Sequence, residues 1–127
     1  AAPDLPALEA RLHEARLHAN LILSHDAYLD VLPVRASKGQ AIRYLAYKWG
    51  LPLRAFLVAG DSGNDLEMLV GDTQAVVVSN HSGELERLRG LEQVYFAEAP
   101  CAAGILEGMA HYGFAWQTAR TLHPEAA

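Results

Sequence analysis

Two short apolar runs, each followed at once by a polar loop, constrain the fold of this chain more than any other feature. The first run covers residues 55–59 and leads into GDSGND at 60–65, and the second covers residues 75–78 and leads into SNHSG at 79–83. A continuous apolar run of this length is typical of a strand covered on both faces. Helical patterns precede and separate the runs, so the sequence predicts an α/β fold with a parallel sheet and right-handed crossovers.

A helix is expected just before the first of these strands. Ser37 and Gln40 have the spacing of a capping box, and Gly50 stands where the helix would stop. The buried stripe of this helix is expected to consist of Ile42, Leu45, Ala46 and Trp49. Shorter helices are expected at about residues 66–70 and 84–89.

The last third of the core is predicted from shorter patterns. A strand is expected at residues 94–96, followed by a helix at about 102–112. Cys101, directly before that helix, is interpreted as a small buried hydrophobic residue. The helix itself is expected to bury Ile105, Leu106 and Met109.

The N-terminal segment breaks this alternation of strands and helices. Asp4 and the apolar residues that follow it at helical spacing predict a helix, and apolar segments at 21–23 and 28–32 predict a β-hairpin. Since this unit does not continue the βαβ pattern, we divide the chain into two parts, residues 1–33 and residues 34–127.

Composition limits the classes of function. The 127 residues include 10 Lys and Arg against 15 Asp and Glu, a net charge of −5 without a basic stripe, so no nucleic-acid partner is expected. No apolar run reaches the roughly 20 residues of a membrane span, and no signal peptide is recognisable, so no membrane partner is expected. The single cysteine excludes an internal disulfide and favours a reducing, cytoplasmic setting.

The first residue is Ala rather than Met, and we expect the chain to be part of a longer protein.

The strongest candidate site is the loop at residues 60–65. In open α/β sheets, ligands bind at the carboxyl ends of the strands, and this loop directly follows a buried strand. It places the carboxylates of Asp61 and Asp65 and the carboxamide of Asn64 in one short turn. Hard oxygen ligands of this kind suit Mg²⁺. A turn of this composition is also common as a purely structural helix start, and that alternative stays open on the turn alone.

Lys38 strengthens the functional interpretation. It stands in the first turn of its helix, where a cation opposes the helix dipole by about 0.3–1 kcal/mol. A solvated surface lysine tolerates that cost, whereas a lysine that faces phosphate charge or fixes a carboxylate nucleophile has a reason to be there. The start of this helix and the end of the next strand lie at the same edge of a βαβ unit. Lys38 and Asp61 are therefore expected to be neighbours.

Lys38, followed by a strand that ends in GDSGND, resembles the third and fourth motifs of the haloacid dehalogenase-like phosphatases. The segments ASKGQA at 36–41 and CAAGI at 101–105 are similar to sucrose-phosphate phosphatases. Residues 43–50 are similar to the phosphatase-like C-terminal domain of sucrose-phosphate synthases. The resemblance extends over residues 30–114 and implies the C-terminal part of a haloacid dehalogenase-like parallel sheet, preceded by a fragment of an α+β cap domain.

The resemblance also implies a chemistry, namely Mg²⁺-dependent hydrolysis of a phosphate monoester through an aspartyl-phosphate, with sucrose 6-phosphate as the favoured substrate. Lys38 would steady the nucleophile and bind the phosphate, and Asp61 would bind Mg²⁺ directly or through water. Asp65 would support the metal site and pair with Lys38 as part of the catalytic group. Asn64 would face the phosphate or the sugar.

One part of the family pattern has no counterpart in this sequence. The family's nucleophile lies in an Asp-x-Asp motif at the end of the first core strand, and no Asp-x-Asp occurs here. By the resemblance, residues 1–33 correspond to the end of the cap domain, and the chain alone is expected to be inactive. The strand at 56–59 would then present an open edge. We expect that edge to pair with the N-terminal half of the same protein or with a second copy of this chain.

Two functions of different classes remain open, beside the plainer interpretation of an α/β domain with an acidic turn and no activity. The first is a Mg²⁺-dependent sugar-phosphate phosphatase, which is favoured by Lys38, Asp61 and Asp65. The second is a non-catalytic phosphatase-like domain that binds a sugar phosphate and regulates an attached glycosyltransferase, as in a sucrose-phosphate synthase. A pure binding domain has less need of a metal-binding carboxylate, whereas the similarity of residues 43–50 to synthases keeps the second function open.

Overall fold

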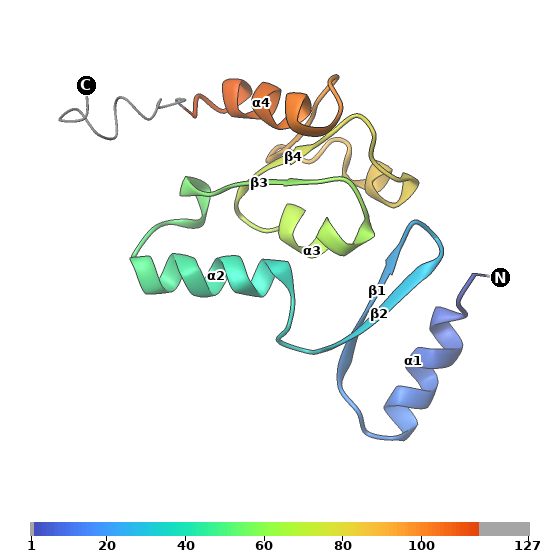
Figure 1. Cartoon of the computed structure of the whole chain (residues 1–127). Coiled ribbons are helices and arrows are strands. Elements are labelled where there is room, and N and C mark those ends of the chain that lie inside the picture. The colour runs from blue at the N-terminus through green and yellow to red at the C-terminus, as the bar shows by residue number, and fades with distance from the viewer. Residues whose placement is uncertain (1, 115–127) are drawn as a thin grey trace, which may run out of the picture.

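A three-stranded parallel sheet forms the centre of the computed structural model, which describes residues 2–114. Its strands lie in the order β3-β4-β5, with Leu57 opposite Gln74 and Ala75 opposite Val94. Helix α4 covers one face, and helices α2 and α3 cover the other (Figure 1). The predicted α/β fold with a parallel sheet is confirmed. The elements of this part are α2 (Lys38–Trp49), β3 (Leu57–Gly60), α3 (Leu66–Leu69), β4 (Gln74–Val77), β5 (Val94–Phe96) and α4 (Cys101–His111).

Three short 3-10 helices connect these elements. They are η1 (Leu53–Ala55), η2 (Gly63–Asp65) and η3 (Gly83–Leu88). A short helix was predicted at 84–89, and in the structure this segment is the 3-10 helix η3. Segments this short commonly take 3-10 geometry when they serve as connectors.

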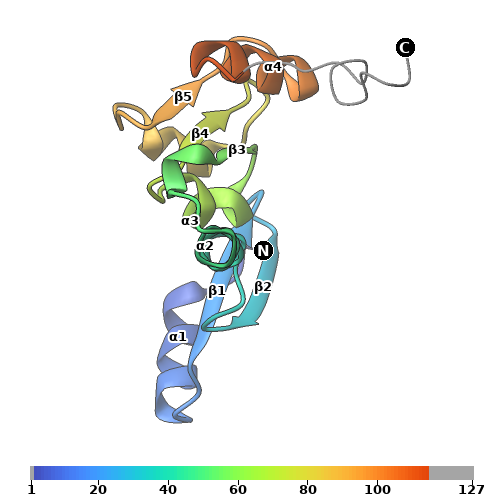
Figure 2. The ribbon, with the colours of Figure 1, turned by 90° about the vertical axis from the view of Figure 1, so that its left-hand side faces the viewer.

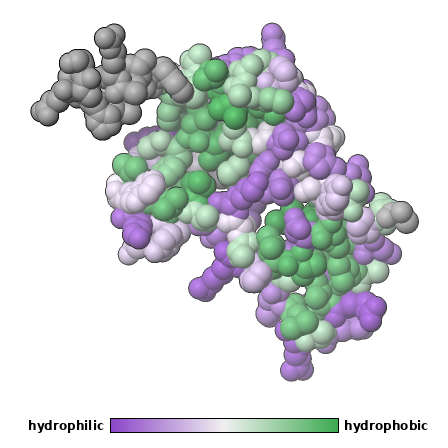
Figure 3. All heavy atoms as spheres, viewed as in Figure 1, coloured by the Kyte–Doolittle hydropathy of each residue, from purple (hydrophilic) through white to green (hydrophobic). Residues whose placement is uncertain are grey.

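The N-terminal unit consists of helix α1 (Leu5–Glu14) and an antiparallel hairpin, β1 (Ala19–Ser24) and β2 (Tyr28–Pro33). It lies beyond α2 and α3, on the side of the molecule away from α4 (Figure 2). On the face drawn in Figure 3, a hydrophilic band separates the apolar surface of this unit from that of the sheet part. Both the helix and the hairpin were predicted from the sequence.

The predicted helix ends are confirmed by their capping contacts. The Asp4 carboxylate accepts a hydrogen bond from the Ala7 amide at 3.1 Å, and the Ser37 hydroxyl accepts one from the Gln40 amide at 3.1 Å. Gly50 ends α2 with a φ of 66°, in the left-handed region where glycine is favoured. Local sequence therefore fixes where α1 and α2 begin and where α2 ends.

The core lies between the sheet and α3, and it includes the fully buried Leu69, Val77 and Leu85. On the opposite face, α4 packs through glycines. A Cβ added at Gly108 would lie only 2.2 Å from Val76 Cγ2, so the helix backbone approaches β4 closely. The prediction that Ile105 and Leu106 are buried was wrong, since they are 38% and 54% exposed. The two glycines, Gly104 and Gly108, occupy the buried face in their place, while Met109 is half-buried.

Two further sequence expectations need correction. Trp49 was assigned to the buried stripe of α2, but it is 59% exposed and stacks on Phe56, with ring centroids 6.3 Å apart. Cys101 was expected to be buried, but it is exposed and has a φ of 50° at the start of α4. Within residues 2–114, β3 has β4 as its only strand neighbour, so its other edge is open. None of the described helices has the length and apolar character needed to cross a lipid bilayer.

Candidate active site

In the loop after β3, a buried carboxylate near the end of the loop bonds back to the first residue after the strand. Asp65 is 5% exposed, and its Oδ2 accepts a hydrogen bond from the Asp61 amide at 3.0 Å. Gly60 makes this possible, because a Cβ there would lie 2.5 Å from Asp65 Cβ. The first and last acidic residues of the loop are thereby held together at the carboxyl end of β3.

Lys38 reaches the same carboxylate from the first turn of α2. Its Nζ donates to Asp65 Oδ1 at 2.5 Å, and the side chains of Lys38 and Asp65 are 52% and 7% exposed. The unfavourable position of the cation at the helix start is thus offset by a carboxylate whose other oxygen is already engaged. The structure brings Lys38, Asp61 and Asp65 together at one edge of the sheet, as the geometry of a βαβ unit predicted.

Asp61 and Asn64 occupy different positions within this loop. Asp61 is exposed, and its carbonyl oxygen accepts hydrogen bonds from the Ser82 amide at 2.7 Å and the Ser82 hydroxyl at 3.3 Å. The loop after β4 therefore supports the loop after β3. Asn64 is half-buried, and its Oδ1 accepts a hydrogen bond from the hydroxyl of the buried Ser62 at 2.8 Å.

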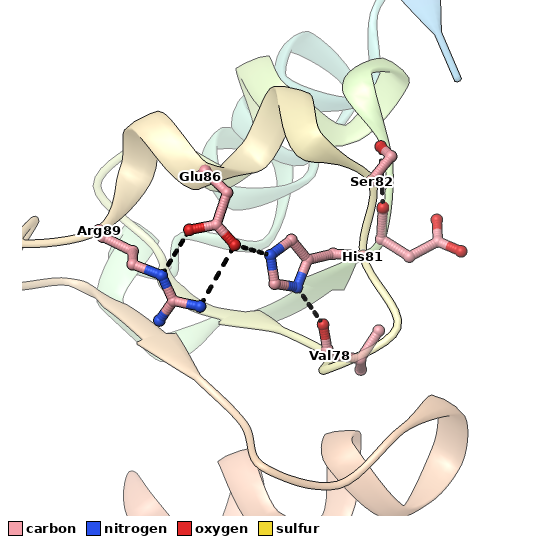
Figure 4. Close-up of polar contacts among 6 residues, drawn as sticks. Val78, His81, Ser82, Glu86 and Arg89 are labelled. Atoms are coloured by element: carbon pink, nitrogen blue, oxygen red, sulfur yellow. Dashed lines mark hydrogen bonds and ion pairs between the residues drawn. The ribbon is translucent and has the colours of Figure 1, made fainter. Parts of the chain in front are cut away.

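A second polar network holds the loop after β4 in place (Figure 4). The two ring nitrogens of His81 lie 2.7 Å from the Val78 carbonyl oxygen and 2.6 Å from Glu86 Oε1. Arg89 donates to Glu86 Oε2 at 2.6 Å. Hydrogen bonds from Arg89 and then from His81 lower the pKa of Glu86 to about 2. Glu86 is therefore a carboxylate at neutral pH and ties this loop to η3.

Asn80 and His81 lie in the loop between β4 and η3. The Asn80 side chain accepts a hydrogen bond from the Cys101 amide at 2.8 Å, at the start of α4 rather than of the next helix in the chain. The side chain of His81 is 8% exposed and is occupied by the network above. The role of both residues in the described structure is to shape the loop.

A cleft of about 710 Å³ separates the N-terminal unit from the sheet part. Its walls come from α1 and β1 on one side and from η2, α3 and η3 on the other, and Asn64 lines it. Glu84, which the sequence analysis missed, lies at one wall and accepts a hydrogen bond from the Asp26 amide at 3.3 Å. No local pattern could reveal this contact, because the two residues are 58 positions apart.

The donor set at the end of β3 fits one side of a Mg²⁺ site. Mg²⁺ in proteins commonly takes one or two carboxylates together with waters and substrate phosphate. Asp61 offers an exposed carboxylate, whereas both oxygens of Asp65 already accept hydrogen bonds. Among residues 2–114, no three His, Cys, Asp or Glu side chains converge as a metal-binding group. Asp61 would therefore be the direct ligand of the ion, and Asp65 would support the site indirectly.

The fold is that of the haloacid dehalogenase-like proteins, since a sugar phosphatase of that superfamily superimposes on the chain with a TM-score of 0.67. Residues 1–113 match the family described as sucrose-6F-phosphate phosphohydrolase, and the chain belongs to that family.

Individual relatives agree with this assignment. The sucrose-phosphatase of Synechocystis, solved in complex with sucrose and phosphate, is 32% identical, superimposes with a TM-score of 0.82, and is matched over 88% of this chain and 47% of its own. A mannosylfructose-phosphate phosphatase of Agrobacterium fabrum is 36% identical over 114 residues, which cover 88% of this chain and 46% of the relative. A glucosylglycerol-phosphate synthase of Pseudomonas anguilliseptica is 37% identical over 77% of this chain, but only 13% of its own length is covered. The chain spans less than half the length of the curated relatives it matches.

Proposed function

We propose that this chain is the C-terminal part of a Mg²⁺-dependent phosphatase that hydrolyses a sugar phosphate monoester, with sucrose 6-phosphate as the favoured substrate. The observation that carries the proposal is the Lys38–Asp65 pair beside the exposed Asp61 at the carboxyl end of β3. A purely structural turn has no need of a half-exposed lysine held at a helix start by a buried carboxylate.

Phosphoryl transfer depends mainly on positioning and on neutralising the phosphate charge. Asp65 fixes the Lys38 ammonium through one oxygen, and half of the lysine side chain stays open to solvent. Lys38 can therefore hold a phosphate oxygen or a neighbouring carboxylate without moving. Mg²⁺, when bound at Asp61, would add further neutralisation of the phosphate charge. Asn64, at the rim of the cleft, is assigned to contacts with the phosphate or the sugar.

The nucleophile in this proposal lies outside the chain. We assign residues 34–127 to the C-terminal part of the core domain and residues 1–33 to the end of a cap domain. The hydrophilic band between their apolar surfaces supports this division (Figure 3). The open edge of β3 is then the place where the strand with the Asp-x-Asp motif pairs. If that strand were absent, the same edge would favour pairing with a second copy of the chain.

The choice of substrate rests on the relatives. The family description and the sucrose-bound neighbour favour sucrose 6-phosphate, and the mannosylfructose-phosphate phosphatase favours a closely similar disaccharide phosphate. Both are phosphate esters of neutral sugars, and Lys38 supplies a cation for the one phosphate group. The single cysteine supports placing the protein in a reducing compartment such as the cytoplasm.

The first experiment replaces the proposed metal ligand in the complete gene product. Asp61→Ala should lower kcat/KM for sucrose 6-phosphate about a hundredfold or more, since it removes electrostatic support from the reacting phosphate. Asp72→Ala, at an exposed aspartate in the turn before β4, is the matched control and should leave the rate unchanged. An unchanged rate in Asp61→Ala would refute the metal assignment.

A second function is favoured by one observation. The glucosylglycerol-phosphate synthase shows that a segment similar to this chain occurs within a much longer synthase. In that setting the chain would be a phosphatase-like regulatory domain, as in a sucrose-phosphate synthase. The coding sequence upstream of Ala1 distinguishes the two. A strand that ends in Asp-x-Asp supports turnover, and a glycosyltransferase without that motif supports regulation.

A further inference from the structure

The tip of the β1–β2 hairpin has a strained turn that the core holds in place. His25 and Asp26 have φ values of 53° and 52°, a left-handed geometry that glycine or asparagine usually supplies, and the Ala27 amide donates to the Ser24 carbonyl oxygen across this turn. Glu84, at the start of η3, accepts a hydrogen bond from the Asp26 amide. A charged carboxylate from the core therefore faces the amides of this turn.

The hairpin also touches the candidate active site directly. A Cβ added at Gly63 would lie 2.1 Å from the Leu23 carbonyl oxygen, so the backbone of β1 rests on the backbone of η2. On the core side, Ser82 precedes Glu84 by two positions and donates to the carbonyl oxygen of Asp61. The hairpin tip and the proposed metal ligand are thus connected through one short segment of the core.

Two buried polar atoms at this junction have no partner within residues 2–114. One is the hydroxyl oxygen of Ser24, a residue that is 6% exposed, and the other is Glu84 Oε2. A hydroxyl can donate a hydrogen bond and a carboxylate can only accept one, so the pair is chemically complementary. Leaving both buried and unpaired is unfavourable, which favours a state of the protein in which they meet.

We propose that Glu84 is a positioning residue that fastens the hairpin to the core and sets it over the active-site loop. Its Oε1 holds the Asp26 amide, and its Oε2 accepts the Ser24 hydroxyl when the hairpin closes further onto the core. This proposal rests on the proposed function. It concerns substrates whose leaving group is a sugar large enough to reach the N-terminal unit. A small aryl phosphate carries no sugar that could reach the hairpin, so its hydrolysis should not depend on this contact.

The test compares two substrates in the complete gene product. Glu84→Gln and Ser24→Ala should each lower kcat/KM for sucrose 6-phosphate about tenfold, mostly through KM, because a hydrogen bond to a charged group is lost. Hydrolysis of p-nitrophenyl phosphate should change less than about twofold. The double variant should lose less than the sum of the two single losses, since both act on one contact. Glu92→Gln, at an exposed glutamate in the loop before β5, is the control and should match the wild type.

A second measurement does not depend on turnover. Hydrogen exchange followed by mass spectrometry should show faster exchange in Glu84→Gln for the peptide that spans residues 24–28, with the α4 peptide unchanged. Equal losses on both substrates, or unchanged exchange at the hairpin tip, would overturn the proposal. If the wild type hydrolyses neither substrate, the proposed function fails. The exchange result alone then decides whether Glu84 holds the hairpin against the core.

Discussion

Replacing Gly60 with alanine tests whether the candidate active-site loop, residues 60–65, packs as closely as the structure shows. An added Cβ would lie 2.5 Å from Asp65 Cβ, 2.7 Å from Oδ2 and 2.8 Å from Cγ. Ordinary contacts of such an atom begin at 3.4 Å, so Asp65 would have to retreat by about 0.9 Å. Gly60 does not have a positive φ, and the effect would therefore come from space alone.

The cost can be estimated from the contacts that the retreat would disturb. Overpacking at a closely packed position costs about 1–3 kcal/mol. The Lys38–Asp65 pair would also weaken, but Lys38 is half exposed, so solvent screening limits this loss to about 1 kcal/mol. Together these effects predict that Gly60→Ala lowers the free energy of unfolding by about 2–4 kcal/mol.

The assay is urea unfolding of the complete gene product, with kcat/KM measured on the same samples. Gly60→Ala should lose stability by the stated amount, and activity should fall about a hundredfold, since Lys38 and the Asp61 amide both depend on the position of Asp65. Gly71→Ala is the matched control, because its Cβ would meet its nearest atom at 3.5 Å, an ordinary contact. A Gly60→Ala protein with wild-type stability and rate would refute the account of this loop.

Two further predictions concern the face covered by α4. Gly108→Ala should lower the free energy of unfolding by about 1–2 kcal/mol, because the clash with Val76 outweighs the roughly 1 kcal/mol gained in helix propensity, whereas Gly83→Ala, in open space, should not destabilise. Glu107 accepts hydrogen bonds from the Glu98 and Ala99 amides and then from Tyr95, and these lower its pKa below 4.5. Its contribution to stability is therefore full above pH 4.5 and is lost as the pH falls through the lowered pKa. Glu107→Gln should lower the melting temperature at pH 7 and reduce its further fall on acidification, as thermal unfolding at several pH values would show.

Features that depend on neighbouring residues in the chain were predictable from the sequence. The caps at Asp4 and Ser37 and the stop at Gly50 follow from local hydrogen bonds and backbone freedom. The two buried strands followed from their continuous apolar runs. The proximity of Lys38 to the loop at residues 60–65 followed from the geometry of a βαβ unit, which brings a helix start and the end of the next strand to one edge.

Features that depend on tertiary packing were not predictable. Ile105 and Leu106 were expected to be buried because helix periodicity is assigned from the large residues. The structure buries Gly104 and Gly108 instead, since only a helix without side chains at these positions comes so close to β4. Similarly, no periodic pattern could pair Glu84 with Asp26, because that contact joins two units that are distant along the chain.

The candidate site has two parts. This chain supplies and orients the groups of the first part, and it does not supply the second. Asp65 orients both the Lys38 ammonium and the Asp61 amide, and Ser82 holds the Asp61 carbonyl oxygen. All of these groups belong to this chain and are fixed by one another, so in the proposed function the electrostatic environment for a phosphate would form as the sheet folds. In the proposed function the attacking carboxylate comes from a strand beside the open edge of β3, where it would meet the exposed side of Lys38. Such a division would separate recognition of the phosphate, encoded here, from the chemistry of its transfer.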